Sequence, residues 1–265
     1  MKKFLFLVLF AFLVLPAYSS SDIEYINDEA GIHIYKINIK KLGSKIKPYV
    51  AKDLMSAKEL YDTGKFQLVV NGGFFDLETG EEISFVKIDG RTVNSPFNNQ
   101  KLISDIKAQN RLTEVINRPE MRIFKLPLDR YKITFEPHFA TNADNIFLVH
   151  SLQAGPFLAP YYKPEVEGFV KHDEFDNVIF DSVNLSKKRE RTILGIRKNN
   201  LYIVLFTENS KMTGYELKEF VKKQKFEYAM ALDGGDSVSA VSKDECIKAN
   251  SNEMRKVKSF LVIER

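Results

Sequence analysis

The sequence has a single cysteine, no tryptophan and only four histidines in 265 residues. One thiol, Cys246, cannot form a disulfide within the chain, so the apolar core must carry the stability of the fold. The histidines, at positions 33, 138, 150 and 172, lack the close spacing of zinc ligands and show no recognisable partner pattern for a nucleophilic serine. These absences disfavour a disulfide scaffold, a histidine zinc site and a serine hydrolase.

Long apolar runs are also absent, apart from one at the N-terminus. Lys2 and Lys3 precede the apolar run Phe4 to Leu15, which is followed by the small-residue stretch Pro16 to Ser20. This pattern is typical of a secretory signal peptide, and the run is too short to span a bilayer. We therefore expect residues 1–20 to be removed and the mature protein to be exported, either periplasmic or secreted, without stable membrane insertion. A retained signal anchor is the alternative.

A large excess of charge of one sign is missing as well. The chain has 39 basic and 35 acidic side chains, which gives a formal net charge of +4. Loss of Lys2 and Lys3 with the signal peptide leaves a net charge of +2. A nearly balanced chain is a poor general polyanion binder, so we expect no nucleic acid partner. Any anion should instead be bound locally, by a few placed residues.

What the chain does contain is enough apolar material for one globular domain. Hydrophobic residues make up 44% of the sequence and aromatic residues 12%, which argues against overall disorder. The length lies within the range of a single domain. We divide the mature chain into an N-terminal strand and helix region, residues 21–65, and a main domain, residues 66–265.

The residue patterns predict many short strands and few helices. A capping box of Thr213 and Glu216 predicts a helix that ends near Lys225, and residues 53–65 have helical spacing. Runs rich in β-branched and aromatic residues predict strands over residues 33–39, 66–70, 83–88, 121–124, 131–135, 145–150, 192–197, 201–206, 228–232, 238–241 and 259–263. This order favours an α+β fold with a mixed, largely antiparallel sheet and a few packed helices.

The segments that connect these elements allow further predictions. Lys198 to Asn200 joins two strands as a hairpin, because asparagine tolerates positive φ. The segment Leu126 to Asp129 joins another antiparallel pair. Residues 94–119 are polar and mixed and are expected to form a surface loop. Residues 160–190 are rich in Pro, Lys, Asp and Glu and are expected to form a solvated excursion or flap.

Three glycine-containing loops follow predicted strands. They are Asn71-Gly72-Gly73-Phe74-Phe75-Asp76, Gln153-Ala154-Gly155-Pro156 and Asp233-Gly234-Gly235-Asp236-Ser237. Each loop combines polar side chains with glycines, whose backbone can closely approach an anion or a sugar hydroxyl. A structural turn is the alternative for each loop, since Asp-Gly and other glycine pairs are common turn sequences.

Together with Arg191-Thr192-Ile193-Leu194-Gly195, these loops resemble the signature motifs of the phosphodiester glycosidase family, in the family's order. The resemblance covers residues 66–263 and is far more specific than any single motif. It implies an exported hydrolase that cleaves the glycosidic bond of a sugar-1-phosphodiester. The animal member of the family removes N-acetylglucosamine from such a phosphodiester. A sugar phosphate or phosphodiester-linked glycan is therefore the expected partner.

The chemistry of this reaction suggests a role for each motif. The departing phosphate monoester is a stable anion near neutral pH, because its second pKa is near ~6. The site then needs a cation for the phosphate, polar groups for the sugar, and a carboxylate that attacks the anomeric carbon or activates water. We predict Asp233 as the catalytic carboxylate and Arg191 as the cation, with a surface ion pair as the alternative for Arg191. The predicted substrate-binding residues are Asn71, Gly72, Gly73, Gln153, Gly155, Gly234, Gly235 and Ser237.

The last motif departs from the family pattern at Asp236, where a small residue is usual. Its carboxylate would repel a phosphodiester unless a base or a metal neutralises it. The sequence requires no cofactor, but a divalent cation bound by Asp233 and Asp236 is possible. Two alternative functions remain at this point. One is a non-catalytic glycan or sugar-phosphate binding protein on the same fold, and the other is a metal-dependent phosphodiesterase.

Overall fold

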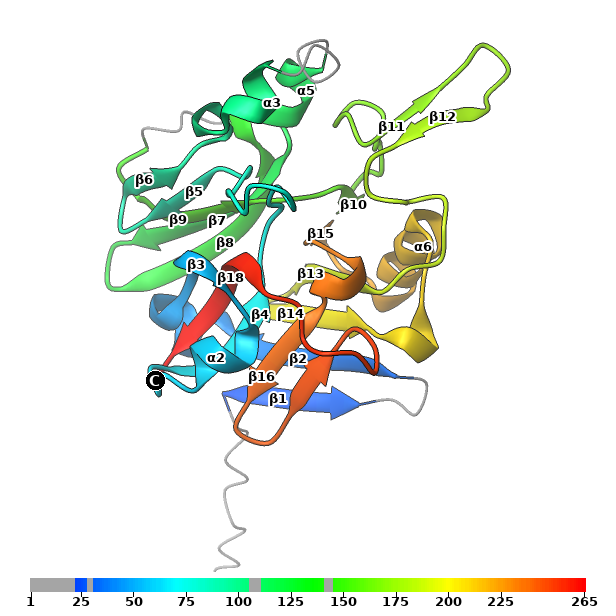
Figure 1. Cartoon of the computed structure of the whole chain (residues 1–265). Coiled ribbons are helices and arrows are strands. Elements are labelled where there is room, and N and C mark those ends of the chain that lie inside the picture. Colours follow the sequence, from blue (N-terminus) through cyan, green and yellow to red (C-terminus); the bar gives the residue numbers. More distant parts are fainter. Residues whose placement is uncertain (1–21, 28–30, 105–110, 141–144) are drawn as a thin grey trace, which may run out of the picture.

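The computed structural model describes residues 22–27, 31–104, 111–140 and 145–265. The predicted signal peptide, residues 1–20, lies outside the described residues. Within the described part of the chain, none of the helices has the length and apolar character needed to cross a membrane. The described strands form three larger sheets and one separate hairpin, and their pairings are antiparallel (Figure 1).

The strand order of each sheet mixes early and late parts of the chain. The first sheet has the order β1 (Ile23–Asn27), β2 (Ile32–Asn38), β14 (Asn200–Phe206), β13 (Arg191–Arg197), β15 (Tyr228–Ala231) and β10 (Phe157–Ala159). The second has the order β17 (Cys246–Lys248), β16 (Ser239–Ser242), β4 (Phe66–Asn71), β18 (Val257–Glu264) and β3 (Ile46–Met55). The third has the order β6 (Arg91–Asn94), β5 (Val86–Ile88), β9 (Leu148–Gln153), β7 (Pro119–Leu126) and β8 (Arg130–Pro137). The predicted α+β fold with largely antiparallel sheet is confirmed.

Two hairpins form where the turn residues predict them. Strands β13 and β14 pair from Arg191 with Phe206 to Arg197 with Asn200, and Lys198 takes a φ of 57° in the turn. Strands β7 and β8 pair in the same way, and Leu128 and Asp129 take positive φ between them. Positive φ in the turn matches the right-handed twist of the flanking strands, which explains why such short connections suffice.

The predicted capping box starts the longest of the helices that the structure describes. Helix α6 (Gly214–Gln224) follows Thr213, whose side chain accepts a hydrogen bond from the backbone N–H of Glu216. The Glu216 carboxylate in turn accepts from the backbone N–H of Thr213, at 2.8 Å. Leu217 and Val221 are buried on the inner face of the helix, against the first sheet. Local capping and an amphipathic pattern therefore suffice to place this helix.

The helix expected over residues 53–65 begins later than predicted. Helix α2 (Ala57–Tyr61) starts after Ser56, which forms its own capping box with Glu59. The preceding residues continue strand β3, where Met55 pairs with Val257 of β18. Pairing with a distant strand therefore overrides the helical spacing of residues 53–55, and the predicted start at Asp53 is wrong.

Residues 94–119 also differ from the expected surface loop. They contain the short helices α3 (Gln100–Ser104) and α5 (Leu112–Ile116) and the start of β7. Val115 and Ile116 are buried, so α5 packs on the core. The remaining short helical elements of the described chain are α1 (Ile39–Leu42), η1 (Gly43–Lys45), η2 (Pro96–Asn98), η3 (His138–Ala140), η4 (Glu208–Ser210) and η5 (Gly235–Ser237).

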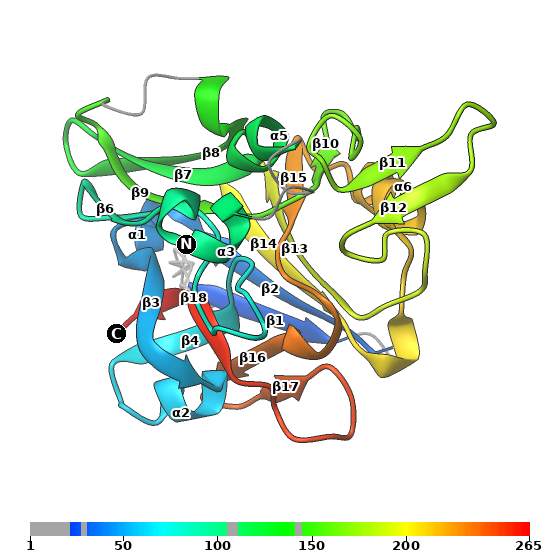
Figure 2. The ribbon, with the colours of Figure 1, turned by 45° about the horizontal axis from the view of Figure 1, so that its top comes forward.

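The core is divided into three apolar clusters by these layers. The largest lies among the three sheets and includes Tyr35, Met121 and Phe157. A second cluster lies between α2 and the outer face of the second sheet, and a third lies between α6 and the first sheet. Figure 2 shows α2 beside β4 and β16, and α6 on the opposite side of the molecule. Burial of apolar surface in all three clusters supplies the main stabilisation, as expected without disulfides.

The ends of three strands meet near the centre of the molecule. Strand β4 of the second sheet ends at Asn71, β9 of the third sheet ends at Gln153, and β15 of the first sheet ends just before Asp233. The N–H of Asp233 donates to the carbonyl of Gly72 at 3.1 Å, and the N–H of Gly155 donates to the carbonyl of Ala231 at 2.9 Å. The first bond joins two of the predicted glycine loops, and the second joins the third loop to the end of β15.

The segment 160–190 contains the separate hairpin of β11 (Val170–His172) and β12 (Val178–Asp181). This hairpin projects away from the sheets, as the predicted excursion implies (Figures 1 and 2). Phe175 at its tip and Ile179 on β12 are exposed. The chain after β12 returns to the body of the protein and packs beside the strand ends.

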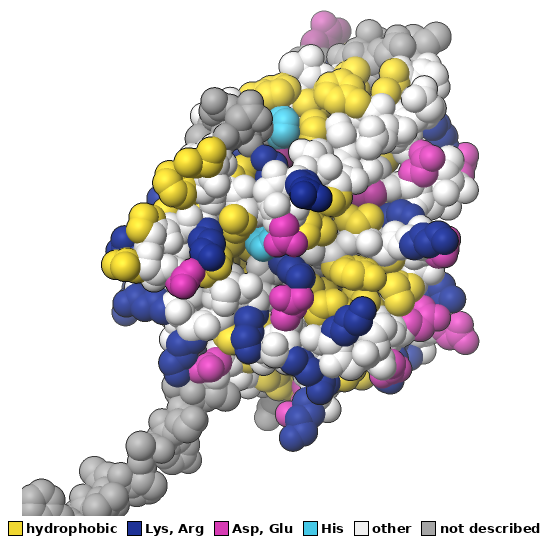
Figure 3. All heavy atoms as spheres, turned by 90° about the vertical axis from the view of Figure 1, so that its left-hand side faces the viewer, with side chains coloured by type: hydrophobic (Ala, Val, Ile, Leu, Met, Phe, Trp, Pro, Cys, Tyr) yellow, Lys and Arg dark blue, Asp and Glu magenta, His cyan; other side chains and the backbone are white. Residues whose placement is uncertain are grey.

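Charged side chains are interspersed on the face of the molecule that carries β3 and the third sheet. Figure 3 shows lysine and arginine beside aspartate and glutamate over this face. The ion pairs Lys47 with Glu264 and Lys125 with Asp129 belong to this part of the structure. This face therefore has the mixed charge that the balanced composition leads us to expect.

Candidate active site

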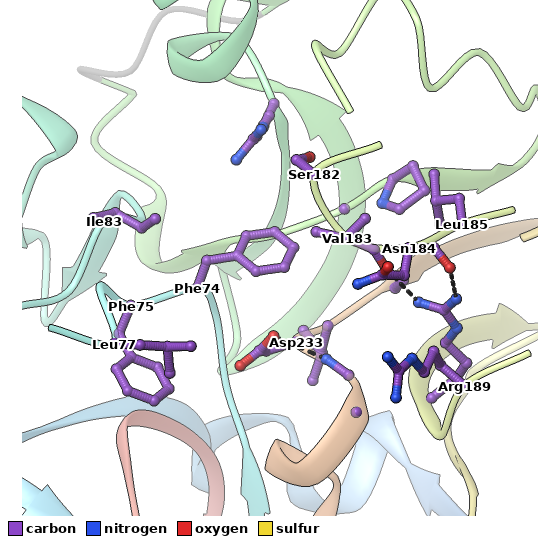
Figure 4. Close-up of a pocket in the computed structure, with 18 of the residues that line it drawn as sticks. Phe74, Phe75, Leu77, Ile83, Ser182, Val183, Asn184, Leu185, Arg189 and Asp233 are labelled. Carbon is purple, nitrogen blue, oxygen red and sulfur yellow. Dashed lines mark hydrogen bonds between the residues drawn. The ribbon is translucent and has the colours of Figure 1, made fainter. Parts of the chain in front are cut away.

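A pocket of about 520 Å³ opens where the three strand ends meet. Figure 4 shows Asp233 between two groups of side chains, one of Phe74, Phe75, Leu77 and Ile83 and the other of Val183, Asn184, Leu185 and Arg189. The charged residues that line the pocket are Arg111, Arg118, Arg189, Arg191, Arg255, Asp233 and Asp236. Among the described residues that line the pocket, five arginines against two aspartates make it cationic, although the chain as a whole is nearly neutral. A local excess of positive charge favours an anionic ligand.

Asp233 is the acidic group at the centre of this pocket. Its Oδ1 accepts a hydrogen bond from the N–H of Gly234 at 2.9 Å. The surrounding protein raises the pKa of Asp233 to about 6 by excluding water, while the Ser237 hydroxyl, the Gly234 N–H, Arg255 and Arg191 oppose this rise. The side chain is only partly covered on its pocket side. A carboxyl with this environment can change its protonation state near neutral pH and still reach a ligand.

Asn71 lies behind Asp233 and holds its backbone. The Asn71 Nδ2 donates to the carbonyl of Asp233 at 2.8 Å, and its Oδ1 accepts from the Thr192 hydroxyl at 2.8 Å and from the Ser239 N–H at 3.2 Å. Asn71 is 0% exposed and does not line the pocket. Its side chain thus connects strands of the first and second sheets, and its predicted contact with a sugar stays a prediction.

Gln153 has a similar position behind the other wall of the pocket. Its Nε2 donates to the carbonyls of Ile116 at 2.7 Å and Arg118 at 3.2 Å, and its Oε1 accepts from the N–H of Phe85 at 3.3 Å. The side chain is buried and does not line the pocket. Gln153 therefore fixes the backbone from which Arg118 extends.

The glycines allow these loops to approach one another. A Cβ on Gly72 would lie 2.6 Å from the backbone carbon of Ser259, and one on Gly73 would lie 2.7 Å from the carbonyl oxygen of Gln153. Gly155 has a φ of 130° and lines the pocket beside Gly234 and Gly235. Side chains would separate the strand ends at Gly72 and Gly73, so these two glycines are required by packing.

Arg191 lines the pocket, but its guanidinium binds backbone carbonyls. Its Nε donates to Met212 at 3.1 Å and its Nη1 to Val183 at 3.0 Å. Its Nη2 donates to Asn184 at 2.6 Å and to Lys187 at 3.1 Å. The residue is 5% exposed, and burial lowers the pKa of Arg191. These bonds attach the chain after β12 to the edge of the pocket.

The unusual Asp236 is neutralised by a base. Its Oδ2 lies 2.7 Å from Nη2 of Arg255, and its Oδ1 accepts from Nδ2 of Asn250 at 3.0 Å. The repulsion of a phosphodiester that its charge suggested is thus offset by an ion pair. In the described residues, no group of three or more His, Cys, Asp and Glu side chains is arranged to hold a metal ion. A cation on Asp233 and Asp236 alone would have only two protein carboxylates.

The comparison with known families agrees with these motifs. The family model of the phosphodiester glycosidases matches residues 64–264. The chain belongs to the phosphodiester glycosidase family. The division of the mature chain at residue 66 stays a prediction. No curated protein sequence matches the chain.

Three solved structures share the fold at low sequence identity. The catalytic domain of the zebrafish N-acetylglucosamine-1-phosphodiester alpha-N-acetylglucosaminidase, auto-inhibited by its pro-peptide, has a TM-score of 0.61 and 16% identity, covering 92% of this chain and 81% of that chain. A hypothetical protein from Synechocystis has a TM-score of 0.60 and 12% identity, covering 92% of this chain and 61% of that chain. A putative exported protein from Burkholderia pseudomallei has a TM-score of 0.64 and 11% identity, covering 88% and 74%.

The structure of this family member also reveals a cation that the motifs do not contain. Arg118 is 8% exposed, and its guanidinium lies 4.0 Å from the ring centre of Phe169 and 5.6 Å from that of Phe74. Its Nε donates to the carbonyl of Glu167 at 3.3 Å. Burial lowers the pKa of Arg118 to about 10, because removal from water makes its charge costly. No local sequence pattern marks Arg118, because it lies outside the four motifs, in the connection between α5 and β7.

A second carboxyl was missed for the same reason. Glu82 is 3% exposed and lies in the connection between β4 and β5, where it bridges to Phe75. The charge of Asp233 contributes to its pKa, so the two carboxyl groups interact. The sequence around Glu82 contains other acidic residues and gives no reason to choose this one. Only its burial beside the strand ends distinguishes it.

Proposed function

We propose that the protein is an exported glycosidase that cleaves the bond between a sugar and phosphate in a sugar-1-phosphodiester of an envelope or extracellular glycan. One observation carries this proposal above the others. The partly covered carboxyl of Asp233 lies in a pocket that is lined by five arginines. A single carboxylate facing an anionic ligand in a cationic pocket is the minimum that this reaction requires.

The leaving group explains why one carboxylate is sufficient. Cleavage between the anomeric carbon and oxygen releases a phosphate monoester, which is already stable as an anion because its second pKa is near ~6. Ionised Asp233 attacks the anomeric carbon or takes a proton from the attacking water. The arginines stabilise the negative charge that accumulates on the departing phosphate.

The hydrogen bonds of Arg191 and Arg118 indicate different roles for these two residues. The four hydrogen bonds of Arg191 go to backbone carbonyls, which supports a positioning role for this residue. In the described structure, the guanidinium of Arg118 makes a single hydrogen bond, through its Nε to the carbonyl of Glu167. We therefore assign phosphate binding to Arg118, with Arg111 as its neighbour on the pocket wall. A buried guanidinium with free donors gains most from an incoming phosphate, because the phosphate compensates its charge.

The assay uses the mature protein with an aryl sugar-1-phosphodiester and compares three variants. We expect Asp233→Asn to lose roughly 10³-fold or more in kcat, and Arg118→Gln to lose about 10²-fold in kcat/KM. Arg118→Lys should retain part of the activity because it keeps the charge. Arg91→Gln, on the exposed strand β6, is the matched control and should behave as the unmodified protein. Equal release by Asp233→Asn and the unmodified protein would contradict the proposal.

Two further measurements separate this function from its alternatives. In ¹⁸O-labelled water, label in the released sugar indicates glycosidic cleavage, whereas label in the phosphate indicates a phosphodiesterase. Tight binding of the sugar phosphodiester without turnover indicates a binding protein. For export, the N-terminus of protein recovered from outside the cytoplasm should begin near residues 18–21. An intact N-terminus on that protein would indicate a retained anchor.

A further inference from the structure

Glu82 is a buried carboxyl that the proposed reaction leaves unused. It forms an isolated bridge with Phe75, and both Phe75 and the next residue, Ile83, line the pocket. The Glu82 Oε1 accepts a hydrogen bond from the N–H of Ser84 at 3.2 Å. Its Oε2 is buried and has no hydrogen-bond partner among the described residues. An ionised carboxylate in this position would have one oxygen without any compensation.

A short chain of contacts connects Glu82 with Asp233. The N–H of Ser84 donates to Glu82, and the Ser84 hydroxyl accepts the N–H of Phe74 at 2.9 Å; the Ser259 hydroxyl accepts the N–H of Gly73 at 3.0 Å. The carbonyl of Ser259 accepts the N–H of Gly72 at 2.9 Å, and the carbonyl of Gly72 accepts the N–H of Asp233 at 3.1 Å. The loop from Gly72 to Phe74 thus contacts Ser84, which binds Glu82, and also accepts the N–H of Asp233. A change of charge on Glu82 acts on a backbone that holds Asp233.

The charged surroundings of Glu82 do not favour two ionised groups. Within the described structure no lysine, arginine or histidine forms an ion pair with Glu82, and the charged group that acts on it is Asp233. Its other polar neighbours are Ser84 and Ser259. Burial raises the pKa of Glu82 to about 7, the two serines oppose this rise, and the charge of Asp233 adds to it. Two negative charges in this buried region are avoided if one of the two carboxyl groups, Glu82 or Asp233, keeps its proton.

We propose that Glu82 is a positioning residue that keeps the proton of this carboxyl pair, so that Asp233 alone is ionised when an anionic substrate enters. This inference rests on the proposed function. Ionisation of Glu82 would add a second negative charge beside the phosphodiester and oppose its binding. The site should therefore have a window of pH in which Asp233 is ionised and Glu82 is still protonated.

Glu82→Gln tests this assignment, because glutamine resembles the protonated acid. We expect the KM of the unmodified enzyme to rise above pH 7, and we expect the variant to lose this rise while keeping kcat/KM within about threefold at pH 6.5. The acid side of its profile should stay where it is, since Glu82 is already protonated and uncharged where Asp233 titrates. Glu81→Gln, at the adjacent exposed position, should keep the unmodified profile. A folded Glu82→Gln variant that is inactive at every pH, or that keeps the rise in KM, would overturn the proposal.

A measurement of thermal stability tests the protonation of Glu82 without any substrate. A buried acid with a raised pKa stabilises the native state at low pH, and this contribution is lost as the pH rises from about 4.5 through about 7. We expect the Tm of Glu82→Gln relative to the unmodified protein to increase by about 5 °C between pH 5 and pH 8. Parallel Tm curves would overturn the assignment of the proton to Glu82. If no sugar phosphodiester is cleaved, the proposed function fails, while the Tm curves still decide the state of Glu82.

Discussion

At the scale of single residues, hydrogen-bond partners separate side chains that bind a ligand from side chains that hold the pocket. Asn71 and Gln153 are amides in the expected loops, yet their hydrogen bonds go to the protein behind Asp233 and Arg118. Arg191 likewise donates to the chain after β12. Positions that hold a site can be as constrained as positions that touch substrate, because a small displacement of a catalytic group is costly.

The role of Arg191 can be tested by its effect on stability. Arg191→Gln removes hydrogen bonds from a buried guanidinium to several carbonyls and should destabilise the fold by about 3 kcal/mol. The corresponding decrease in Tm is roughly 6–12 °C. Arg118→Gln, which removes a cation with few protein partners, should change the Tm much less while raising KM. If Arg191→Gln keeps its Tm and only KM rises, Arg191 binds the phosphate as the motif alone predicted.

The pKa of Asp233 gives the acid side of the pH profile. Its value of about 6 means that the carboxylate is ionised above this pH and protonated below it. If the ionised form attacks or acts as a base, kcat/KM should fall about tenfold for each pH unit below 6. Steady-state rates between pH 4.5 and pH 7 measure this limb. A profile that is flat down to pH 4.5 would exclude Asp233 as the titrating group.

At the scale of secondary-structure elements, local signals and long-range pairing compete. The capping box of Thr213 and the hairpin turn at Lys198 act within a few residues, and both elements form as predicted. The start of α2 was predicted wrongly because β3 continues through Met55 in its pairing with β18. Sheet pairing of distant segments is a tertiary effect and overrides spacing within one segment.

The start of α6 can be tested by removing its cap. Thr213→Ala removes the side-chain oxygen that accepts the N–H of Glu216 and should cost about 1 kcal/mol. The expected decrease in Tm is about 2–4 °C. Lys223→Ala, at an exposed position in the same helix, is the control and should change stability by no more than about 0.5 kcal/mol. An equal effect of both substitutions would show that the cap contributes nothing.

At the scale of the whole molecule, the site exists because three sheets end at one place. Strands β4, β9 and β15 belong to different sheets, and hydrogen bonds between their following loops join them. Gly73 makes one such close approach, since a Cβ there would lie 2.7 Å from the carbonyl oxygen of Gln153, and Gly72 packs equally closely on Ser259 of β18 in its own sheet. The pocket therefore depends on packing between sheets as well as on the residues that line it.

Gly72→Ala should disturb this junction and the activity together. We expect a destabilisation of about 1–3 kcal/mol from the forced separation and a large loss of kcat, because the carbonyl of Gly72 holds the N–H of Asp233. Gly64→Ala is the control, since a Cβ at Gly64 meets no atom within 4 Å although its φ is 78°. The Tm of that variant should decrease because of backbone strain, while its kcat/KM should stay unchanged. Full activity of Gly72→Ala would show that the junction tolerates displacement.

The sequence by itself determined the local features and the family. Turn residues, capping boxes and apolar runs act over a few positions, so they predicted α6, two hairpins and most strands. The order of four motifs indicated the phosphodiester glycosidase family and pointed to Asp233. Only the tertiary structure decided which polar residues face the pocket. Arg118 and Glu82 come from segments without a motif, and Arg191 turns its donors to carbonyls, because burial and hydrogen-bond partners depend on contacts between distant segments.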